Sequence, residues 1–277
     1  MEQSKARFLF RNRVKFPQIH FLILGASRVN REYFRRDIFD RSFPKWPCPH
    51  CRRGELHPIA EPGYDRPTAE TLRYVHDPDR EAGWVRRRFF LQFSCPSCPE
   101  GMLLVGEATD DAYHYFDENT GEEEHGHFEV VYPKYLYPAV SLINVPDAAP
   151  ATIRQALDEA AELFWVSGQA TVNALRKAVE CLMTDQGIPG FGADKKFVPL
   201  HDRIVEFSKA HPDFKNLLTA VKLLGNAGSH EDVPDDLDGM LFDALEIVEF
   251  VLVNLYDKPI LKMDALAQRI EARLKPH

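Results

Sequence analysis

The stretch Lys222-Leu-Leu-Gly225-Asn226-Ala-Gly228-Ser-His230 lies where the apolar residues of the chain recur with helical spacing. If the stretch is helical, Lys222, Asn226 and His230 are four residues apart and share one face. The two glycines lower the stability of a helix, so their presence needs a structural reason. The close approach of another helix, or of a ligand, would supply that reason. The stretch therefore predicts either a tight helix contact or a binding site.

The helical period extends over the C-terminal part of the chain from residue 151 onward. It predicts helices at about 151–166, 168–186, 199–211, 213–229, 236–256 and 260–274. Helices with such short connections favour an antiparallel bundle. Prolines between residues 132 and 150 separate this bundle from a β-rich front part. The sequence thus predicts an α+β protein, with a β-rich region at residues 1–137 and a helical bundle at residues 138–277.

The chain has 277 residues, enough for two domains, and its hydrophobic fraction of 44% is ordinary for a globular protein. It contains no run of about 18 apolar residues, so we expect no membrane-spanning helix. The segment Met1–Phe16 interleaves basic and aromatic residues and lacks the apolar core of a secretory signal. We therefore expect a cytoplasmic protein with no membrane association.

Charge is distributed unevenly along the chain. Residues 1–104 carry 19 Lys and Arg against 12 Asp and Glu, residues 105–150 carry 1 against 10, and residues 151–277 carry 14 against 20. A basic front part beside an acidic remainder could steer a polyanion to one end of the molecule. The alternative is that the two domains complement each other in charge, and composition favours neither interpretation.

Two Cys-x-x-Cys pairs lie in the front part, in Trp46-Pro-Cys48-Pro-His-Cys51 and in Cys95-Pro-Ser-Cys98. Each pair is a tight turn that directs two thiolates to one point, and two such turns supply the four ligands of a tetrahedral zinc ion. The 43 residues between the pairs exceed the usual loop of about 15 to 20, which indicates a zinc ribbon with an insertion. Two disulfides are the alternative, and a cytoplasmic location disfavours them.

The segment Trp84–Phe93 predicts a strand that ends beside the second cysteine pair. It begins with three consecutive arginines, Arg86, Arg87 and Arg88, which are followed by two phenylalanines. Basic residues beside aromatic residues on such a strand could contact phosphates and stack on bases. The simpler interpretation is an ordinary strand whose basic start is solvated.

A β-hairpin is predicted further along the front part. Met102–Glu107 predicts a return strand, and Tyr113–Phe116 with His127–Tyr132 predicts two strands around an Asn-Thr-Gly turn. The tip is acidic, and three histidines lie near it, namely His114, His125 and His127. These groups could bind a cation, but their spacing matches no defined ligand set, so a solvated tip is the simpler interpretation.

Five sequence elements together resemble a known family. They are the aromatic connector Tyr132-Pro-Lys-Tyr-Leu-Tyr-Pro138, then Leu175-Arg-Lys-Ala-Val-Glu180, Leu200-x-x-Arg-Ile204, Leu224-Gly-Asn-Ala-Gly-Ser-His230 and Glu249-Phe-Val-Leu-Val-Asn-Leu-Tyr256. In this order they resemble the bacterial family called domain of unknown function 4145, over about residues 132–258. The resemblance implies a HEPN-like helical bundle that forms a homodimer, a zinc ribbon ahead of it, and an association with restriction or phage-defence systems.

The resemblance also implies a candidate nuclease site. HEPN ribonucleases bring an Arg and a His, about four to six residues apart, together across a dimer, where they stabilise phosphate charge and transfer a proton. In this chain the nearest basic residue before His230 is Lys222, eight positions away, and Lys lacks the planar fork of Arg. Arg176, which we expect to pair with Glu180 at the i and i+4 positions, is an alternative.

Three functions follow as hypotheses. The first is a non-catalytic, zinc-containing module that binds nucleic acid, a nucleotide or a partner protein, with Arg86, Arg87, Arg88 and Arg176 as candidate binding residues. The second is a metal-independent RNase at a dimer interface, with Lys222, Asn226 and His230 as candidate catalytic residues. The third is a structural or regulatory subunit that binds another protein through its acidic face. A simple packing role for Asn226 and His230 is the alternative to a site there, so the sequence does not decide whether the protein is an enzyme.

Overall fold

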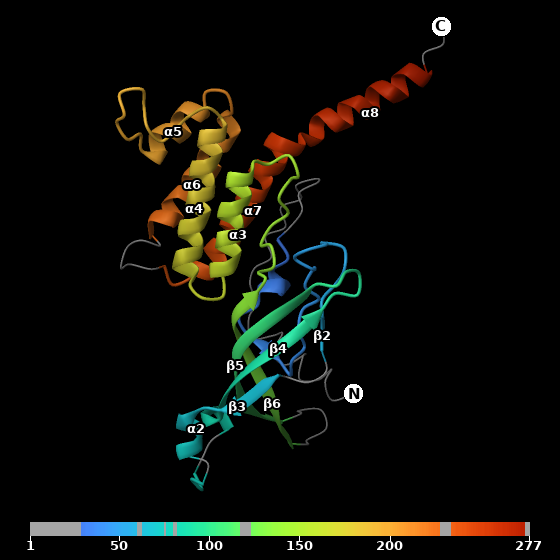
Figure 1. The fold of residues 1–277 in the computed structure, drawn as a ribbon, viewed down its shortest axis with the longest axis vertical. Coiled ribbons are helices and arrows are strands. Elements are labelled where there is room, and N and C mark those ends of the chain that lie inside the picture. The colour runs from blue at the N-terminus through green and yellow to red at the C-terminus, as the bar shows by residue number, and fades with distance from the viewer. Residues whose placement is uncertain are drawn as a thin grey trace.

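The computed structural model describes residues 29–59, 63–74, 76–79, 82–116, 123–227 and 234–274. Over these residues the protein is a mixed α+β structure, in which an antiparallel sheet precedes a group of helices (Figure 1). The predicted α+β class is therefore confirmed. His230 lies outside the described residues.

The sheet has the strand order β1-β6-β5-β4-β2, and β3 also pairs with β4. The strands are β1 (Ile38–Phe39), β2 (His57–Pro58), β3 (Tyr64–Pro67), β4 (Arg86–Ser94), β5 (Gly101–Phe116) and β6 (Glu123–Tyr137). Three short helices accompany them, namely η1 (Arg31–Phe34), α2 (Ala69–Arg73) and η2 (Ala82–Trp84). All strand pairs are antiparallel, and β4, β5 and β6 form the long centre of the sheet.

Strand β5 is one continuous strand of 16 residues, although the sequence predicted two short ones. The residues between the two predicted strands include Asp110 and Asp111, which have low strand propensity. Strand β6 nevertheless pairs with β5 from residue 103 to residue 116. The cross-strand pairing therefore outweighs the local preference of the two aspartates.

The prediction of an aromatic connector at residues 132–138 is wrong, because its first six residues belong to β6. The strand tolerates Pro133 because the pairing is irregular there: Gly106 pairs with Pro133, whereas the preceding residue of β5 pairs with Tyr135. A Cβ atom on Gly106 would lie 2.7 Å from the carbonyl oxygen of Tyr132. A glycine opposite the proline thus lets the two strands approach closely at this bulge.

The C-terminal helices are α3 (Ala151–Leu163), α4 (Gly168–Asp185), α5 (Leu200–Phe207), η3 (Pro212–Phe214), α6 (Lys215–Ala227), α7 (Leu237–Leu252), the π-helical turn η4 (Val253–Asp257) and α8 (Pro259–Leu274). Each of the six predicted helices is present, with ends that differ by a few residues. The side chains of Ser167 and Asp236 cap the N-termini of α4 and α7 by accepting hydrogen bonds from backbone N–H groups. A HEPN-like topology of these helices stays a prediction.

The segment before β1 packs the sheet region against the helices. Arg36 donates hydrogen bonds to both carboxylate oxygens of Asp238, at 2.8 and 2.9 Å, and to the carbonyl oxygen of Phe164. The buried ring of Phe34 packs edge-on against the Phe164 ring, with centroids 5.2 Å apart. The buried apolar residues form one core that continues from the sheet into the helices. Strand β6 ends at Tyr137, and the predicted division into two domains at that point stays a prediction.

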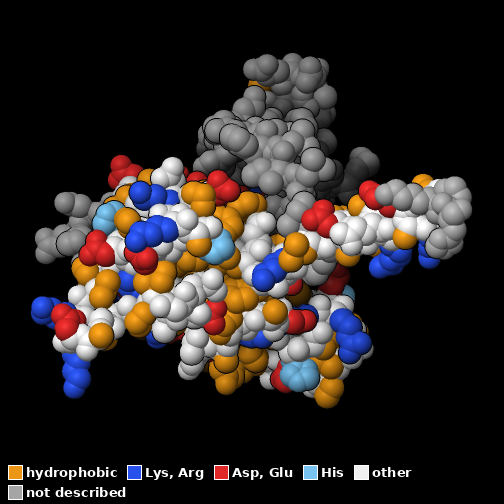
Figure 2. Space-filling model, turned by 90° about the horizontal axis from the view of Figure 1, so that it is seen from above, with side chains coloured by type: hydrophobic (Ala, Val, Ile, Leu, Met, Phe, Trp, Pro, Cys, Tyr) orange, Lys and Arg blue, Asp and Glu red, His pale blue; other side chains and the backbone are white. Residues whose placement is uncertain are grey.

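Helix α8 projects away from the other helices (Figure 1). Its described side chains after Pro259 are exposed, and they mix apolar and charged groups along the projecting arm in Figure 2. The other long helices, α3 to α7, pack around the helical part of the core.

Candidate metal centre and sheet surface

The four cysteines of the two predicted turns come together in one cluster. Their Sγ atoms all lie within 4.8 Å of one another, with 3.7 Å between Cys48 and Cys98 and 3.6 Å between Cys51 and Cys95. Bonds of about 2.3 Å from a tetrahedral zinc ion to sulfur place neighbouring sulfurs about 3.8 Å apart. All four thiols are free, so the structure contains no disulfide among them. The cluster therefore fits a single tetrahedral metal ion.

Backbone hydrogen bonds shape the two turns that hold the thiols. In the first turn, Cys48 N–H donates to the Gly54 carbonyl at 2.8 Å, and Arg52 adopts a left-handed conformation with φ 56°. The second turn joins β4 to β5, and Cys95 N–H donates to the Glu100 carbonyl at 3.1 Å. The cysteines are thus positioned by the ends of sheet strands and by tight turns, which agrees with a preformed site.

Gly54 lies where the two turns meet. A Cβ atom at this position would lie 2.4 Å from Cys95 Sγ and 3.0 Å from Ser97 Oγ. Real Cβ atoms do not approach other atoms so closely, so any larger residue would push the turns apart. Sequence analysis did not identify this glycine, because its role depends on the approach of a segment about 40 residues away.

The electrostatics of the thiols also favour a bound cation. Backbone N–H groups of Arg53 and Gly54 lower the pKa of Cys51 to about 6. The N–H of Glu100 lowers the pKa of Cys98, but burial and the three neighbouring thiols outweigh it and raise that pKa to about 12. Four thiolates this close repel one another, and a metal cation removes that repulsion.

Trp46 anchors the metal centre in the core. Its ring is fully buried, packs edge-on against Phe93 with centroids 5.5 Å apart, and donates a hydrogen bond from Nε1 to the Tyr33 carbonyl at 2.6 Å. Because Phe93 lies on β4 two residues before Cys95, this contact links the two cysteine turns through the core. The cysteine cluster is therefore joined to the core at one end of the sheet.

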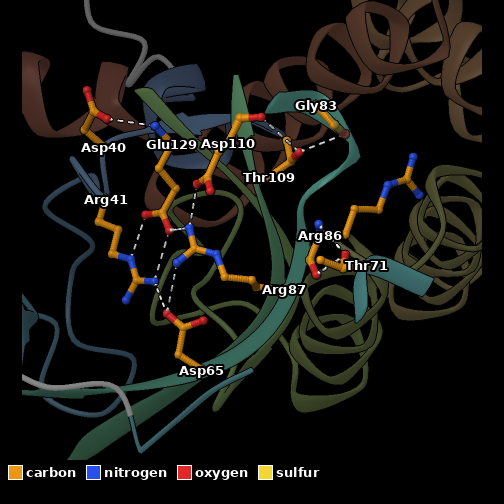
Figure 3. Close-up of polar contacts among 10 residues, drawn as sticks. All are labelled: Asp40, Arg41, Asp65, Thr71, Gly83, Arg86, Arg87, Thr109, Asp110 and Glu129. Carbon is orange, nitrogen blue, oxygen red and sulfur yellow. Dashed lines mark hydrogen bonds and ion pairs between the residues drawn. The ribbon is translucent and has the colours of Figure 1, made fainter. Parts of the chain in front are cut away.

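The three predicted arginines do not lie on one face of the sheet. Arg87 lies on the core side of the sheet and pairs with Asp110 at 2.8 Å, with Glu129 at 2.5 Å and with Asp65 at 3.8 Å (Figure 3). Arg41 joins this cluster through Glu129 and Asp65, and the Glu129 carboxylate raises the pKa of the Arg41 guanidinium. Arg87 is thus held by three carboxylates, which makes it a poor phosphate ligand.

Arg86 and Arg88 belong to the opposite face of the sheet, because alternate residues of a strand point to opposite faces. Figure 3 shows Arg86 directed away from the cluster around Arg87. Arg88 is exposed and lies 3.5 Å from Glu107 on β5. These two arginines remain accessible to a ligand.

The face that carries them, called here the open sheet face, is rich in aromatic residues. It contains Tyr64, Phe90, Leu103, Val105, Tyr132, Tyr135 and Tyr137, together with Arg66, Arg86, Arg88 and Glu107. Most of these side chains are exposed, and Tyr137 is 56% and Tyr64 47% accessible. Sequence analysis missed this surface because the last three tyrosines were assigned to a connector. The spacing of Tyr135 and Tyr137, which are two residues apart as on one face of a strand, could have identified this surface.

The described residues of the opening motif, 222–227, form the end of α6. Lys222 and Asn226 are half-buried on this helix. A Cβ atom on Gly225 would lie 2.6 Å from Arg176 Cβ on α4, so this glycine allows two helices to approach closely, as the sequence predicted. Arg176 also pairs with Glu180 at 3.3 Å, again as predicted. Because His230 lies outside the described residues, the catalytic assignment of these residues stays a prediction.

A small cavity among the described helices is lined by apolar side chains of α3, α4, α6 and α7. Its volume of about 10 Å³ would hold about one water molecule. This cavity gives no support to nucleotide binding inside the helical region. Among the described helices, none is both long and apolar enough to cross a membrane.

Comparison with known proteins supports the family resemblance. Residues 142–273 match the family model described as Domain of unknown function (DUF4145), and residues 34–136 match a second one, described as Domain of unknown function (DUF8608). No match was found among curated proteins or solved structures. The resemblance to the family of domain of unknown function 4145, which the motifs predicted, is thus confirmed for the helical part of the chain, residues 142–273.

Proposed function

We propose that this protein binds single-stranded nucleic acid on the open sheet face, and that a structural zinc ion at the four cysteines holds this face in shape. The observation that carries the proposal is the presence of two stacked aromatic pairs and several arginines on one exposed surface. From the family resemblance we also propose that the binding serves a restriction or phage-defence system.

The aromatic pairs provide flat surfaces on which bases can stack. Tyr64 and Phe90 are stacked with ring centroids 6.4 Å apart and planes 7° apart, and Tyr135 and Tyr137 are stacked at 6.3 Å and 14°. Val105 lies between the two pairs in the cross-strand register. Stacking of a base on an aromatic side chain contributes about 1–3 kcal/mol and depends little on base identity.

The arginines of this face supply positive charge next to the rings. Arg66 on β3 is directly opposite Arg88 on β4, and like charges in directly opposite positions destabilise a sheet. Within the described residues, Glu107 is the carboxylate that pairs with Arg88, through an exposed contact. A phosphate group between Arg66 and Arg88 would relieve the remaining repulsion.

Zinc suits the cysteine cluster better than other ions do. Thiolates are soft ligands, and zinc accepts a tetrahedral set of four of them without redox chemistry. The cluster lies at the end of β4 and β5, next to the row of the open sheet face that contains Leu103 and Tyr137. A zinc ion there would hold the β4–β5 turn and keep the aromatic rows in register.

The proposal is tested by measuring the affinity for labelled single-stranded RNA and DNA by fluorescence anisotropy, with duplex DNA for comparison. We expect the logarithm of the binding constant to fall with the logarithm of salt concentration, with a slope of about 0.7 per phosphate contact. Tyr135→Ala and Arg88→Glu should each weaken binding by about tenfold or more, because each removes a stacking or phosphate contact.

Two control variants match these changes on other surfaces. Phe191→Ala removes an exposed ring from the α4–α5 loop, and Arg269→Glu reverses a charge on α8. Both controls should bind as the wild type does. If no single strand binds at low salt, or if the controls lose as much affinity as the sheet variants, the proposal is wrong. Loss of a stoichiometric protein partner in the sheet variants alone would assign the face to protein binding instead.

A further inference from the structure

We propose that the β5–β6 hairpin carries a second metal site, formed by His114, His125 and His127 with Glu123 as a fourth ligand. The site would take a late first-row divalent ion such as Zn²⁺ or Ni²⁺, because imidazole nitrogen suits these ions. It is separate from the cysteine cluster and does not depend on nucleic-acid binding.

The strand register brings these four side chains to one face. His114 on β5 is directly opposite His125 on β6, and the next pairs along the same face are Phe116 with Glu123 and Ala112 with His127. Directly opposite residues point to the same side of a sheet, as do residues two apart on one strand. His114 therefore has one histidine directly across from it, with His127 and Glu123 as diagonal neighbours.

Two of the donor atoms already lie at a suitable distance. His114 Nε2 is 3.5 Å from Glu123 Oε2. Metal bonds of about 2.0–2.1 Å in a tetrahedral site place such donors about 3.4 Å apart. A single ion could therefore bind both atoms with little change of the backbone.

The other two imidazoles have to rotate to complete the site. In the part of the chain that the structure describes, the cysteine thiols are the only group of three or more donors gathered within 4.8 Å. The side chains of His125 and His127 are exposed, and the residue opposite His127 is the small Ala112. Rotation about the side-chain bonds toward His114 is therefore sterically open.

The opposite face of the hairpin fixes the register on which the site depends. A Cβ atom on Gly126 would lie 2.8 Å from the ring of Tyr113, so this ring lies directly over the glycine and a larger residue would displace it. The Tyr113 ring also packs against the buried Phe128, with centroids 6.4 Å apart. A slip of β6 by one residue would move His125 and His127 to the face opposite His114 and is opposed by these contacts.

The charge of the surrounding sequence favours a cation. Residues 105–150 carry 1 Lys or Arg against 10 Asp and Glu. The next carboxylates on the same face, Asp110 and Glu129, are already paired with Arg87. Because Arg87 and Arg41 balance their charge, these two carboxylates do not compete with the histidines for the ion.

The experiment is a calorimetric titration of the purified full-length protein with Zn²⁺, after the cysteine site has been filled. We expect one further equivalent per chain for the wild type, with the same result for Ni²⁺. The double variant His114→Ala/His125→Ala should lose this equivalent, and Glu123→Gln should weaken it by at least about threefold. His201→Ala, which removes an exposed histidine on α5, should bind as the wild type does.

Three results would overturn the proposal. These are a wild type that takes up no metal beyond the cysteine equivalent, a double variant that still binds the second equivalent, and an equal loss in His201→Ala. Circular dichroism shows whether the double variant is folded. If it is not, the single variant His127→Ala provides the same test, with an expected loss of at least about tenfold in affinity.

Discussion

At the scale of single residues, the protein depends on small side chains where segments distant in sequence meet. Gly54 lies against the sulfur of Cys95, Gly106 lies against a backbone carbonyl at the β6 bulge, and Gly126 lies beneath a tyrosine ring. In each case a Cβ atom would meet another atom at less than 3.0 Å. The identity of these residues is therefore determined by neighbours that the local sequence does not reveal.

Gly54→Ala should weaken both the metal centre and the fold. The added methyl group would lie 2.4 Å from Cys95 Sγ, so the two cysteine turns have to separate. We expect a loss of about 1–3 kcal/mol in the free energy of unfolding, as for other overpacked sites. Chemical denaturation of the metal-loaded protein measures the loss, and competition with a chelator measures the metal affinity.

Gly83→Ala is the matched control for this variant. A Cβ atom at Gly83 would meet no other atom within 4 Å, so the change should leave the stability and the metal affinity nearly unchanged. Equal stability of Gly54→Ala and the wild type, in the presence of metal, would show that the two turns are not packed as described.

The cysteines and the arginines show which site residues the local sequence can predict and which it cannot. The Cys-x-x-Cys spacing identified all four members of the thiol cluster, because each turn is a local structure. The triplet Arg86–Arg88 was predicted as one basic patch, yet strand alternation sends Arg87 to the opposite face. The partners of Arg87 come from three other strands, so only the strand register could identify them.

At the scale of elements, helices were predicted more accurately than strands. The period of the apolar residues depends on contacts within each helix, and it located all six C-terminal helices. The long β5–β6 hairpin is stabilised by pairing between strands, which overrides the two aspartates in β5 and the proline in β6. Local propensity therefore divided β5 in two and ended β6 too early.

Gly225→Ala tests the close contact between α4 and α6. Alanine would stabilise an isolated helix by about 1 kcal/mol relative to glycine. In the folded protein, however, the new Cβ would lie 2.6 Å from Arg176 Cβ, an atom fixed to the backbone of α4. Because this atom cannot move without the helix, we expect net destabilisation of about 1–2 kcal/mol, measured by urea unfolding.

A substitution on the exposed side of α6, away from the contact with α4, is the control for Gly225→Ala. Leu223→Ala changes an exposed residue of the same helix and should change stability by less than about 0.5 kcal/mol. A more stable Gly225→Ala protein would mean that helix propensity dominates and that α4 and α6 are not in close contact.

At the scale of the whole molecule, the sheet and the helices share one hydrophobic core, but their supports differ. The helices are held by apolar packing, whereas at the cysteine end of the sheet two short turns pack on Trp46 and Phe93 and gather four thiols at one point. Ring contacts of Phe34 and the ion pair of Arg36 with Asp238 connect the two regions. Metal loss should therefore act on one end of the molecule and leave the other in place.

Removal of the metal should loosen the cysteine turns before the helices. Metal binding and folding are coupled in such sites, because the unfolded chain has no preformed site and the free energy of metal binding therefore stabilises the folded turns. Hydrogen exchange of the chelated protein should rise most in the two turns and in the adjoining ends of β4 and β5, while α3 and α4 stay protected. Cys95→Ser should reproduce this pattern and lose the metal, whereas Cys181→Ser, on α4 and outside the cluster, should match the wild type in both respects. Exchange that rises as much in α4 as in the turns, or that does not change on chelation, would show that the cysteine cluster does not support the sheet.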